Sequence, residues 1–283
     1  MAQATCDNAA PVNGHQPNQY VNCQANSRVF DARPGGSLWL YEDTDPENAT
    51  TLNWTNIRQI GSGFTGRVLA SDASYVYDIT PSGDLNLYHY GQNSWANLGE
   101  TIGTGWDAWA SGAGQGQITI DSTGTIYAVN AQGQLMSYRY DEDHGGWRNS
   151  GTVIDSGWGG YRLILAGDNG EFYAVDGQGN LYRSHYNAAT GQWITHNQLF
   201  GSGWQNVSSM ASAGANTVYA VNGQNGQLDW YDFGAANPES LAPQARGCVP
   251  SRRPGAARSH RDPGCSPRRP ERSSASSAPR VAM

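Results

Sequence analysis

Short stretches that alternate apolar and polar residues fill most of the chain, and glycine interrupts them about every ten residues. The most regular stretch is 127–135, YAVNAQGQL, in which two apolar segments flank Asn130 and Gly133. Asn and Gly tolerate the backbone of a tight reversal, so this stretch predicts a β-hairpin. No stretch has the apolar spacing of a helix of useful length.

The hairpin pattern occurs five times. It is repeated closely at 173–181 (YAVDGQGNL) and 219–228 (YAVNGQNGQL), and more loosely at 77–85 (YDITPSGDL) and 30–38 (FDARPGGSL). The leucines that end these patterns are separated by 47, 50, 46 and 47 residues. A hairpin cannot bury its own faces and must stack on its neighbours, so a strand-rich period of this size indicates the blades of a propeller.

Each repeat contains further strand-like parts. A tryptophan segment follows the hairpin, then a Gly-x-Gly-aromatic corner, and then one more apolar segment before the next hairpin. The tryptophans are Trp54, Trp95, Trp147 and Trp193, and the corners end on Phe64, Trp106, Trp158 and Trp204. Four strands per repeat is the composition of a propeller blade. We therefore predict an all-β fold, a five-bladed β-propeller of ~47-residue repeats over residues 28–237.

The two ends of the chain differ from the repeats. Residues 1–27 form a polar, Gly/Asn/Gln-rich lead, in which Cys6 and Cys23 are either a disulfide that ties the lead together or two free thiols. Residues 238–283 are rich in Arg, Pro and Ser and predict a disordered tail, because they cannot bury enough apolar surface. The fifth repeat lacks a tryptophan segment and a corner, so we expect its blade to be incomplete.

Charge restricts the classes of partner. The net charge is −7, divided into −14 over residues 1–245 and +7 over 246–283, and the chain has no lysine. An acidic body argues against nucleic acid as a partner. No apolar run reaches the ~20 residues that span a bilayer, so we expect no membrane insertion. Ala2-Gln3-Ala4 resembles the residues before a signal-peptidase cut, and we expect a secreted protein whose signal peptide has been removed.

The order of hairpin, tryptophan and corner over residues 28–233 resembles the tachylectin-type lectins. These are five-bladed propellers that bind N-acetylated sugars between neighbouring blades. The resemblance implies a non-catalytic lectin without a cofactor, monomeric and multivalent toward N-acetylated sugars or polysaccharides on cell surfaces. It also implies that the C-terminus supplies the first strand of the first blade. The chain departs from the pattern at Phe64, at Asp155 in place of glycine, and in its last quarter-turn.

A lectin site needs a flat aromatic face against the sugar ring and a few polar groups for its substituents. The corner rings Phe64, Trp106, Trp158 and Trp204 are candidates for the aromatic face. Their neighbours Asp107, Gln205 and Asn206 are candidates for the polar groups. In the alternative interpretation, the corner rings only fill the space between blades. The tryptophans within the blades are interpreted as packing residues.

Two other functions remain open. A structural or protein-interaction propeller would use the corner rings for packing alone. A propeller glycoside hydrolase would need paired carboxylates at a central funnel, whereas the carboxylates here cluster in loops such as Asp141-Glu142-Asp143. The six histidines have no metal-ligand spacing, so we expect no metal site.

Overall fold

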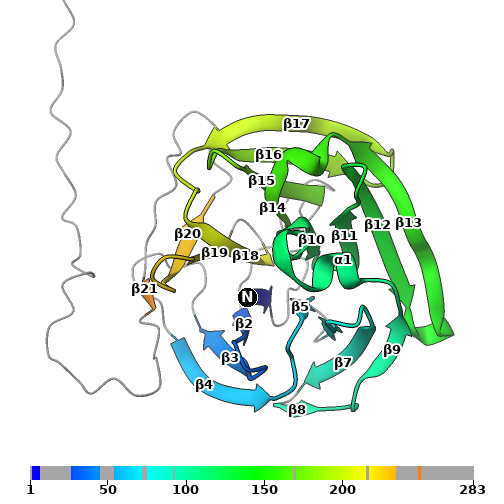
Figure 1. The fold of residues 1–283 in the computed structure, drawn as a ribbon, viewed down its shortest axis with the longest axis vertical. Helices are drawn as coiled ribbons and strands as arrows, with labels where there is room; N and C mark the ends of the chain where they lie inside the picture. The colour runs from blue at the N-terminus through cyan, green and yellow to red at the C-terminus, as the bar shows by residue number, and fades with distance from the viewer. Residues whose placement is uncertain are drawn as a thin grey trace, which may run out of the picture. The chain divides into compact units, whose positions relative to one another are not determined.

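The computed structural model describes residues 2–6, 27–44, 54–71, 75–91, 93–167, 170–214, 217–233 and 248–249. Within them lie five antiparallel sheets, arranged as the blades of a five-bladed β-propeller (Figure 1). In four of the sheets, successive strands are hydrogen-bonded neighbours, so these blades are meanders; in the remaining sheet, β7 pairs with both β8 and β9. The predicted fold class is confirmed. Among the described residues, no helix is long and apolar enough to cross a membrane.

The blades are built from the following strands. Blade 1 comprises β1 (Ala2–Cys6), β2 (Ser27–Ala32), β3 (Leu38–Asp43) and β4 (Trp54–Gly61). Blade 2 comprises β5 (Arg67–Ala70), β6 (Tyr75–Ile79), β7 (Leu85–Gly91), β8 (Ser94–Trp95) and β9 (Glu100–Gly103). Blade 3 comprises β10 (Ile118–Ile120), β11 (Thr125–Val129), β12 (Gln134–Asp141) and β13 (Gly146–Ser156).

The same plan continues in the last two blades. Blade 4 comprises β14 (Tyr161–Ala166), β15 (Glu171–Asp176), β16 (Leu181–Asn187) and β17 (Gln192–Gly201). Blade 5 comprises β18 (Val207–Gly214), β19 (Thr217–Asn222), β20 (Leu228–Asp232) and β21 (Cys248–Val249). Helical turns occur only as α1 (Asp107–Ala110), η1 (Gly112–Gln117), η2 (Glu142–His144) and η3 (Trp158–Gly160) within the described ranges.

The first blade departs from our expectation. Ala2–Cys6 is its innermost strand, antiparallel to β2 with Ala2 opposite Asp31 and Cys6 opposite Ser27. We expected an irregular lead at 1–27 and a first strand supplied by the C-terminus, so both expectations are wrong for this segment. The error has a physical reason: AQATC alternates apolar and polar residues, but the segment is short and its apolar side chains are small, and the pairing with β2 cannot be read from the segment itself. β1 also packs beside β18 and β5, at the centre of the ring (Figure 1).

The ring closes between blades 5 and 1 through side chains. Tyr219 of β19 donates its hydroxyl to Asp43 Oδ2 at 3.1 Å, and the same hydroxyl lies 2.8 Å from Ser27 Oγ. Its ring also contacts Trp54 of β4, with centroids 5.7 Å apart. In blade 5, β21 pairs with β20 through two residues, Cys248 and Val249. The predicted 238–283 tail lies outside the described residues except for Cys248 and Val249. Cys23 also lies outside them, and with it the predicted disulfide to Cys6.

The apolar core is divided among the spaces between blades. Four buried clusters each join two neighbouring blades, and each contains one corner ring: Phe64, Trp106, Trp158 or Trp204. The alternation read from the sequence explains this division, because each strand presents one set of apolar residues to each neighbouring blade.

Candidate functional site

The corners are held in place by the hairpins. The backbone N–H of Trp158 donates to the carbonyl of Gly133, in the β11–β12 turn, at 2.8 Å. Gly133 has φ +73°, which favours glycine, and a Cβ there would lie 3.1 Å from the Gly159 nitrogen. At the other corners the N–H of the aromatic residue likewise donates to a hairpin glycine carbonyl at 3.0 Å: Phe64 to Gly36, Trp106 to Gly83 and Trp204 to Gly179. The hairpin signature of the sequence therefore positions the corner that follows it.

The corner rings do not present an open face. Phe64 and Trp106 are 6% exposed, Trp158 is 1% and Trp204 is 2%. Three of them lie against the tryptophan of the next blade, with centroids 5.8–5.9 Å apart: Phe64 on Trp95, Trp106 on Trp147 and Trp158 on Trp193. Trp204 lies 5.9 Å from Phe233 instead. A ring buried to this degree cannot offer its flat face to a sugar, so the stacking role expected for these four residues is corrected to packing between blades.

The polar corner residues are differently placed. Asp107, at the start of α1, and Gln205 are exposed, and Asn206 is half-buried. The carbonyl of Asn206 accepts a 2.8 Å hydrogen bond from the Gly223 N–H, so its backbone joins the corner to the hairpin of blade 5. Gln205 lies directly against the turn of blade 4, because a Cβ on Gly179 would be 2.5 Å from the Gln205 nitrogen. The structure thus brings Gln205 and Asn206 to the blade 4–5 corner and Asp107 to the blade 2–3 corner.

A denser polar cluster lies between blades 3 and 4. Asp155 lies near the end of β13, beside its corner, and its Oδ2 accepts a 2.6 Å hydrogen bond from Trp158 Nε1. The same oxygen lies 2.6 Å from His196 Nε2 of β17, in the neighbouring blade. The His196 ring lies over Trp193, with centroids 5.0 Å apart. Asp155 therefore links a buried corner ring to an exposed histidine across the gap between blades.

Asn197 and two tyrosines complete this cluster. Tyr161 Oη donates to Asn197 Oδ1 at 3.0 Å, and the Tyr161 ring contacts Tyr182 at 5.6 Å. Burial and the neighbouring Tyr182 raise the pKa of Tyr161, so its hydroxyl stays protonated and able to donate. The Nδ2 of Asn197 has no partner among the described residues. We call Asp155, Tyr161, Tyr182, His196 and Asn197 the blade 3–4 cluster.

The sequence carries only a weak signal for this cluster. Asp155 was noted only as a departure from the Gly-x-Gly corner, and His196 and Asn197 were not singled out. The usable signal was that departure, because an acidic residue in place of a corner glycine brings a hydrogen-bond acceptor to a site between blades.

The tryptophans of the blades pack as expected: Trp95 Nε1 donates to the Ile60 carbonyl at 2.7 Å and Trp147 Nε1 to the Ile102 carbonyl at 3.1 Å. Within the described ranges, no group of His, Cys, Asp and Glu is placed to hold a metal ion.

Comparisons with known proteins give a family and a coarse structural likeness. The family model described as Tachylectin matches residues 32–246. A search of curated protein sequences found no match. Among solved structures, the Aleuria aurantia lectin in complex with Fucα1-6GlcNAc has 12% identity and a TM-score of 0.48, with 91% of this chain and 97% of that chain covered.

Two further structures are similar at the same level. AofleA from Arthrobotrys oligospora has 14% identity and a TM-score of 0.46, over 87% of this chain and 73% of that chain. The GH43B protein of a Bacteroides ovatus xyloglucan locus has 12% identity and a TM-score of 0.46, over 87% and 57%. Likeness at this level assigns no function. The family match is different in kind, because it covers about three quarters of the sequence in one stretch, and the chain therefore belongs to the tachylectin family.

Proposed function

We propose that this carbohydrate-binding lectin recognises N-acetylated sugars at the corners between neighbouring blades, without catalysing a reaction. Family membership supports carbohydrate binding. The observation that carries the finer proposal is the blade 3–4 cluster, which places an exposed histidine, an exposed asparagine and two half-buried tyrosines around one corner. Sugar sites combine aromatic surface with a few oriented polar groups, and this cluster has both.

The chemistry of an acetamido group suits the cluster. Its carbonyl needs a donor, and Asn197 Nδ2 is a donor that no other described residue engages. Its N–H needs an acceptor, and the carboxylate of Asp155 lies beside the same gap. Its methyl group needs an apolar wall, which the rings of Tyr161 and Tyr182 supply. A neutral hydroxyl in place of the acetamido group would leave these groups partly unpaired, which favours the N-acetylated sugar.

Repetition would strengthen weak individual sites. Four corners with the same backbone geometry lie between successive blades, but they carry different side chains. On a cell surface or a polysaccharide, engaging a second corner is an intramolecular event whose effective concentration depends on spacing. The proposal therefore includes multivalent binding by a secreted monomer, with the blade 3–4 corner contributing the most.

Calorimetric titration with N-acetylglucosamine and glucose tests the proposal directly. We expect binding of N-acetylglucosamine alone, weakened about tenfold by His196→Ala and by Asn197→Ala, since each removes a polar contact. Ser150→Ala is the matched control, because Ser150 is the third residue after Trp147, as His196 is after Trp193. Equal binding of both sugars would contradict the N-acetyl preference. Size-exclusion chromatography with light scattering checks the monomer.

A structural or protein-interaction propeller is the second candidate, and the burial of the four corner rings favours it. These rings are 1–6% exposed, so packing between blades is sufficient to explain their presence. A glycan array separates the two functions. If a folded, monomeric protein binds no N-acetylated sugar and no polysaccharide on the array, the lectin proposal fails and the structural function stands. Turnover of chromogenic glycosides would instead indicate a hydrolase.

A further inference from the structure

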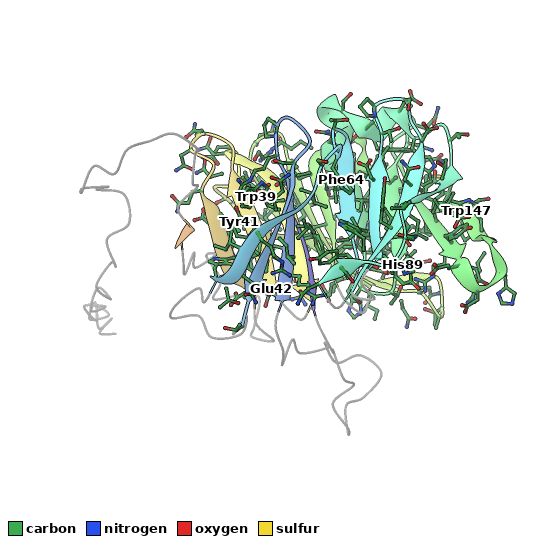
Figure 2. The ribbon with its side chains drawn as sticks, turned by 90° about the horizontal axis from the view of Figure 1, so that it is seen from below. Trp39, Tyr41, Glu42, Phe64, His89 and Trp147 are labelled. Carbon is green, nitrogen blue, oxygen red and sulfur yellow. The ribbon has the colours of Figure 1, made fainter. Side chains whose placement is uncertain are left out.

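A cavity of ≈ 130 Å³ lies between blades 2 and 3, away from the corners. Tyr75 and Tyr77 of β6 line one side, and Arg139, Glu142 and Asp143 line the other. Tyr75 pairs with His89 near the end of β7, whereas the corner adjoins the start of that strand, where Leu85 pairs with Gly103. Figure 2 shows His89 toward the opposite edge of the blades from Phe64. The cavity therefore opens on the other face of the propeller from the proposed sugar sites.

Three hydrogen-bond donors from two blades lie around Gly124, which lines this cavity together with Tyr77 and Arg139. A Cβ on Gly124 would lie 3.2 Å from Arg139 Nη1 and 3.8 Å from both Ser71 Oγ and Tyr77 Oη. Ser71 is 1% exposed and its hydroxyl has no partner among the described residues. Tyr77 is 4% exposed, lines the cavity, and likewise makes no hydrogen bond to any described residue. In the next blade the equivalent Tyr127 donates to Asp121, at the position that Ser71 occupies here.

Arg139 supplies a positive charge beside Gly124. Its Nη1 donates to Thr123 Oγ1 at 3.2 Å, and no carboxylate of the described residues forms an ion pair with it. A guanidinium has five donors in a planar fork that matches a carboxylate, and one hydroxyl acceptor leaves most of them available. Burial is the largest cause that raises the pKa of Tyr77, so that hydroxyl stays protonated and donates.

The rim of the cavity is acidic, but two of its carboxylates are already engaged. Asp141 Oδ2 accepts from Arg148 Nε at 2.7 Å and lies 2.8 Å from His144 Nδ1. Glu142 Oε1 lies 2.5 Å from His89 Nε2. Glu142 also forms a hydrogen bond with Tyr75, and burial together with this bond raises the pKa of Tyr75 to about 12. Asp143 is exposed at the mouth. A ligand in the cavity would thus meet donors at one end and acceptors at the other.

We propose that this cavity is a second ligand site, for a small hydroxylated carboxylate of the size of one acidic sugar. The carboxylate pairs with Arg139 and accepts from Tyr77, and the hydroxyls donate to the carboxylates at the rim. A single negative charge fits better than the double charge of a phosphate, because three carboxylates and two arginines line the cavity. A neutral sugar would leave the guanidinium without an anion.

Titration of the full chain with glucuronate, followed by NMR, tests this site. We expect saturable binding of glucuronate, at least about tenfold weaker binding of glucose and inorganic phosphate, and no competition from N-acetylglucosamine. Tyr77→Phe, which keeps the ring and removes one donor, should weaken glucuronate about tenfold. Arg139→Met should abolish binding, and Arg139→Lys should give an intermediate loss because it keeps the charge without the fork.

Tyr161→Phe is the control on the other face and should leave glucuronate affinity unchanged. Thermal melting of each variant confirms that it is folded, and Tyr77→Phe removes a hydroxyl without a partner, so its melting temperature should match that of the parent. Glucuronate affinity that is unchanged in folded Tyr77→Phe and Arg139→Met would overturn the proposal. Equal binding of glucose, or no saturable glucuronate binding by the folded parent protein, would also overturn it. These outcomes are independent of N-acetylglucosamine binding at the corners.

Discussion

The backbone N–H of Asn197 donates to Ser184 Oγ at 2.8 Å, at a bulge in the pairing of β16 with β17 where Asn197 has φ +52°. In blades 2 and 3 the corresponding positions carry Gly99 and Gly151, near Tyr88 and Tyr138. A Cβ on Gly99 would lie 2.4 Å from the Tyr88 ring, and a Cβ on Gly151 would lie 3.1 Å from Tyr138. In blades 2 and 3 an added side chain would thus meet the facing tyrosine, whereas in blade 4 the facing residue is Ser184 and Asn197 fits.

Ser184→Tyr should therefore destabilise the protein, whereas the same change together with Asn197→Gly should be tolerated. Overpacking of this kind costs about 1–3 kcal/mol, and residues in contact couple by about 0.5–3 kcal/mol. Urea unfolding of both single variants and the double variant measures the coupling. Additive free energies would show that the two positions are independent.

The hairpin glycines should position the corners proposed to bind sugar. Gly133→Ala places a methyl group 3.1 Å from the Gly159 nitrogen and strains a φ of +73°, so it should displace the Trp158 corner and weaken N-acetylglucosamine binding. Gly145→Ala is the matched control, with φ +61° and no atom within 4 Å of the added Cβ. Both should lose roughly 1–2 kcal/mol of stability from backbone strain. Equal sugar affinity in the two variants would count against the hairpin as the support of the corner.

The stability of the protein should depend on pH through Asp78. Its Oδ1 is buried without a partner among the described residues, and desolvation raises the pKa of its carboxyl to about 6. Between about pH 4 and 6 the folded state holds a proton that the unfolded chain has released. The contribution of Asp78 to the free energy of unfolding therefore falls as pH rises from about 4 to 6. The equivalent residues in blades 3, 4 and 5 are Ala128, Ala174 and Ala220.

Asp78→Asn should raise the free energy of unfolding at pH 7.5 by at most about 3 kcal/mol and change it little at pH 4. Asp31→Asn is the control at the same strand position in blade 1, and it should not stabilise, because Asp31 Oδ2 accepts a 3.0 Å bond from Arg33. Denaturant titrations at the two pH values provide the measurement. A gain for Asp78→Asn that is equal at both pH values would rule out the titration of this carboxyl as its cause.

Closure of the ring should depend on the Tyr219 hydroxyl. Tyr219→Phe removes the contacts to Asp43 and Ser27 and leaves buried polar groups behind, which costs about 1–3 kcal/mol. Tyr77→Phe is the matched control in blade 2 and should stay within about 0.5 kcal/mol of the parent, since its hydroxyl has no described partner. Thermal unfolding of the two variants compares them. Similar losses would mean that the closing contacts contribute nothing specific.

The repeat order, the blade number and the place of every corner follow from the amino-acid sequence. Each of these is encoded locally, by alternation at period two and by glycine at the turns, so YAVNAQGQL predicts its own hairpin without reference to the rest of the chain. The family resemblance follows from the same local signals and is confirmed by the family match.

Only the tertiary structure decided which residues share a surface. Ala2–Cys6 has only a short alternation of small apolar and polar residues, and it forms a strand because β2 offers it unpaired backbone groups. The corner rings look like exposed binding residues in the sequence, but the neighbouring blade covers them. His196 meets Asp155 across 41 residues, and Tyr77 and Arg139 of neighbouring blades both lie beside Gly124. A period identifies the blades, but it does not determine what each blade presents to the next one, because that depends on side chains far apart in the chain.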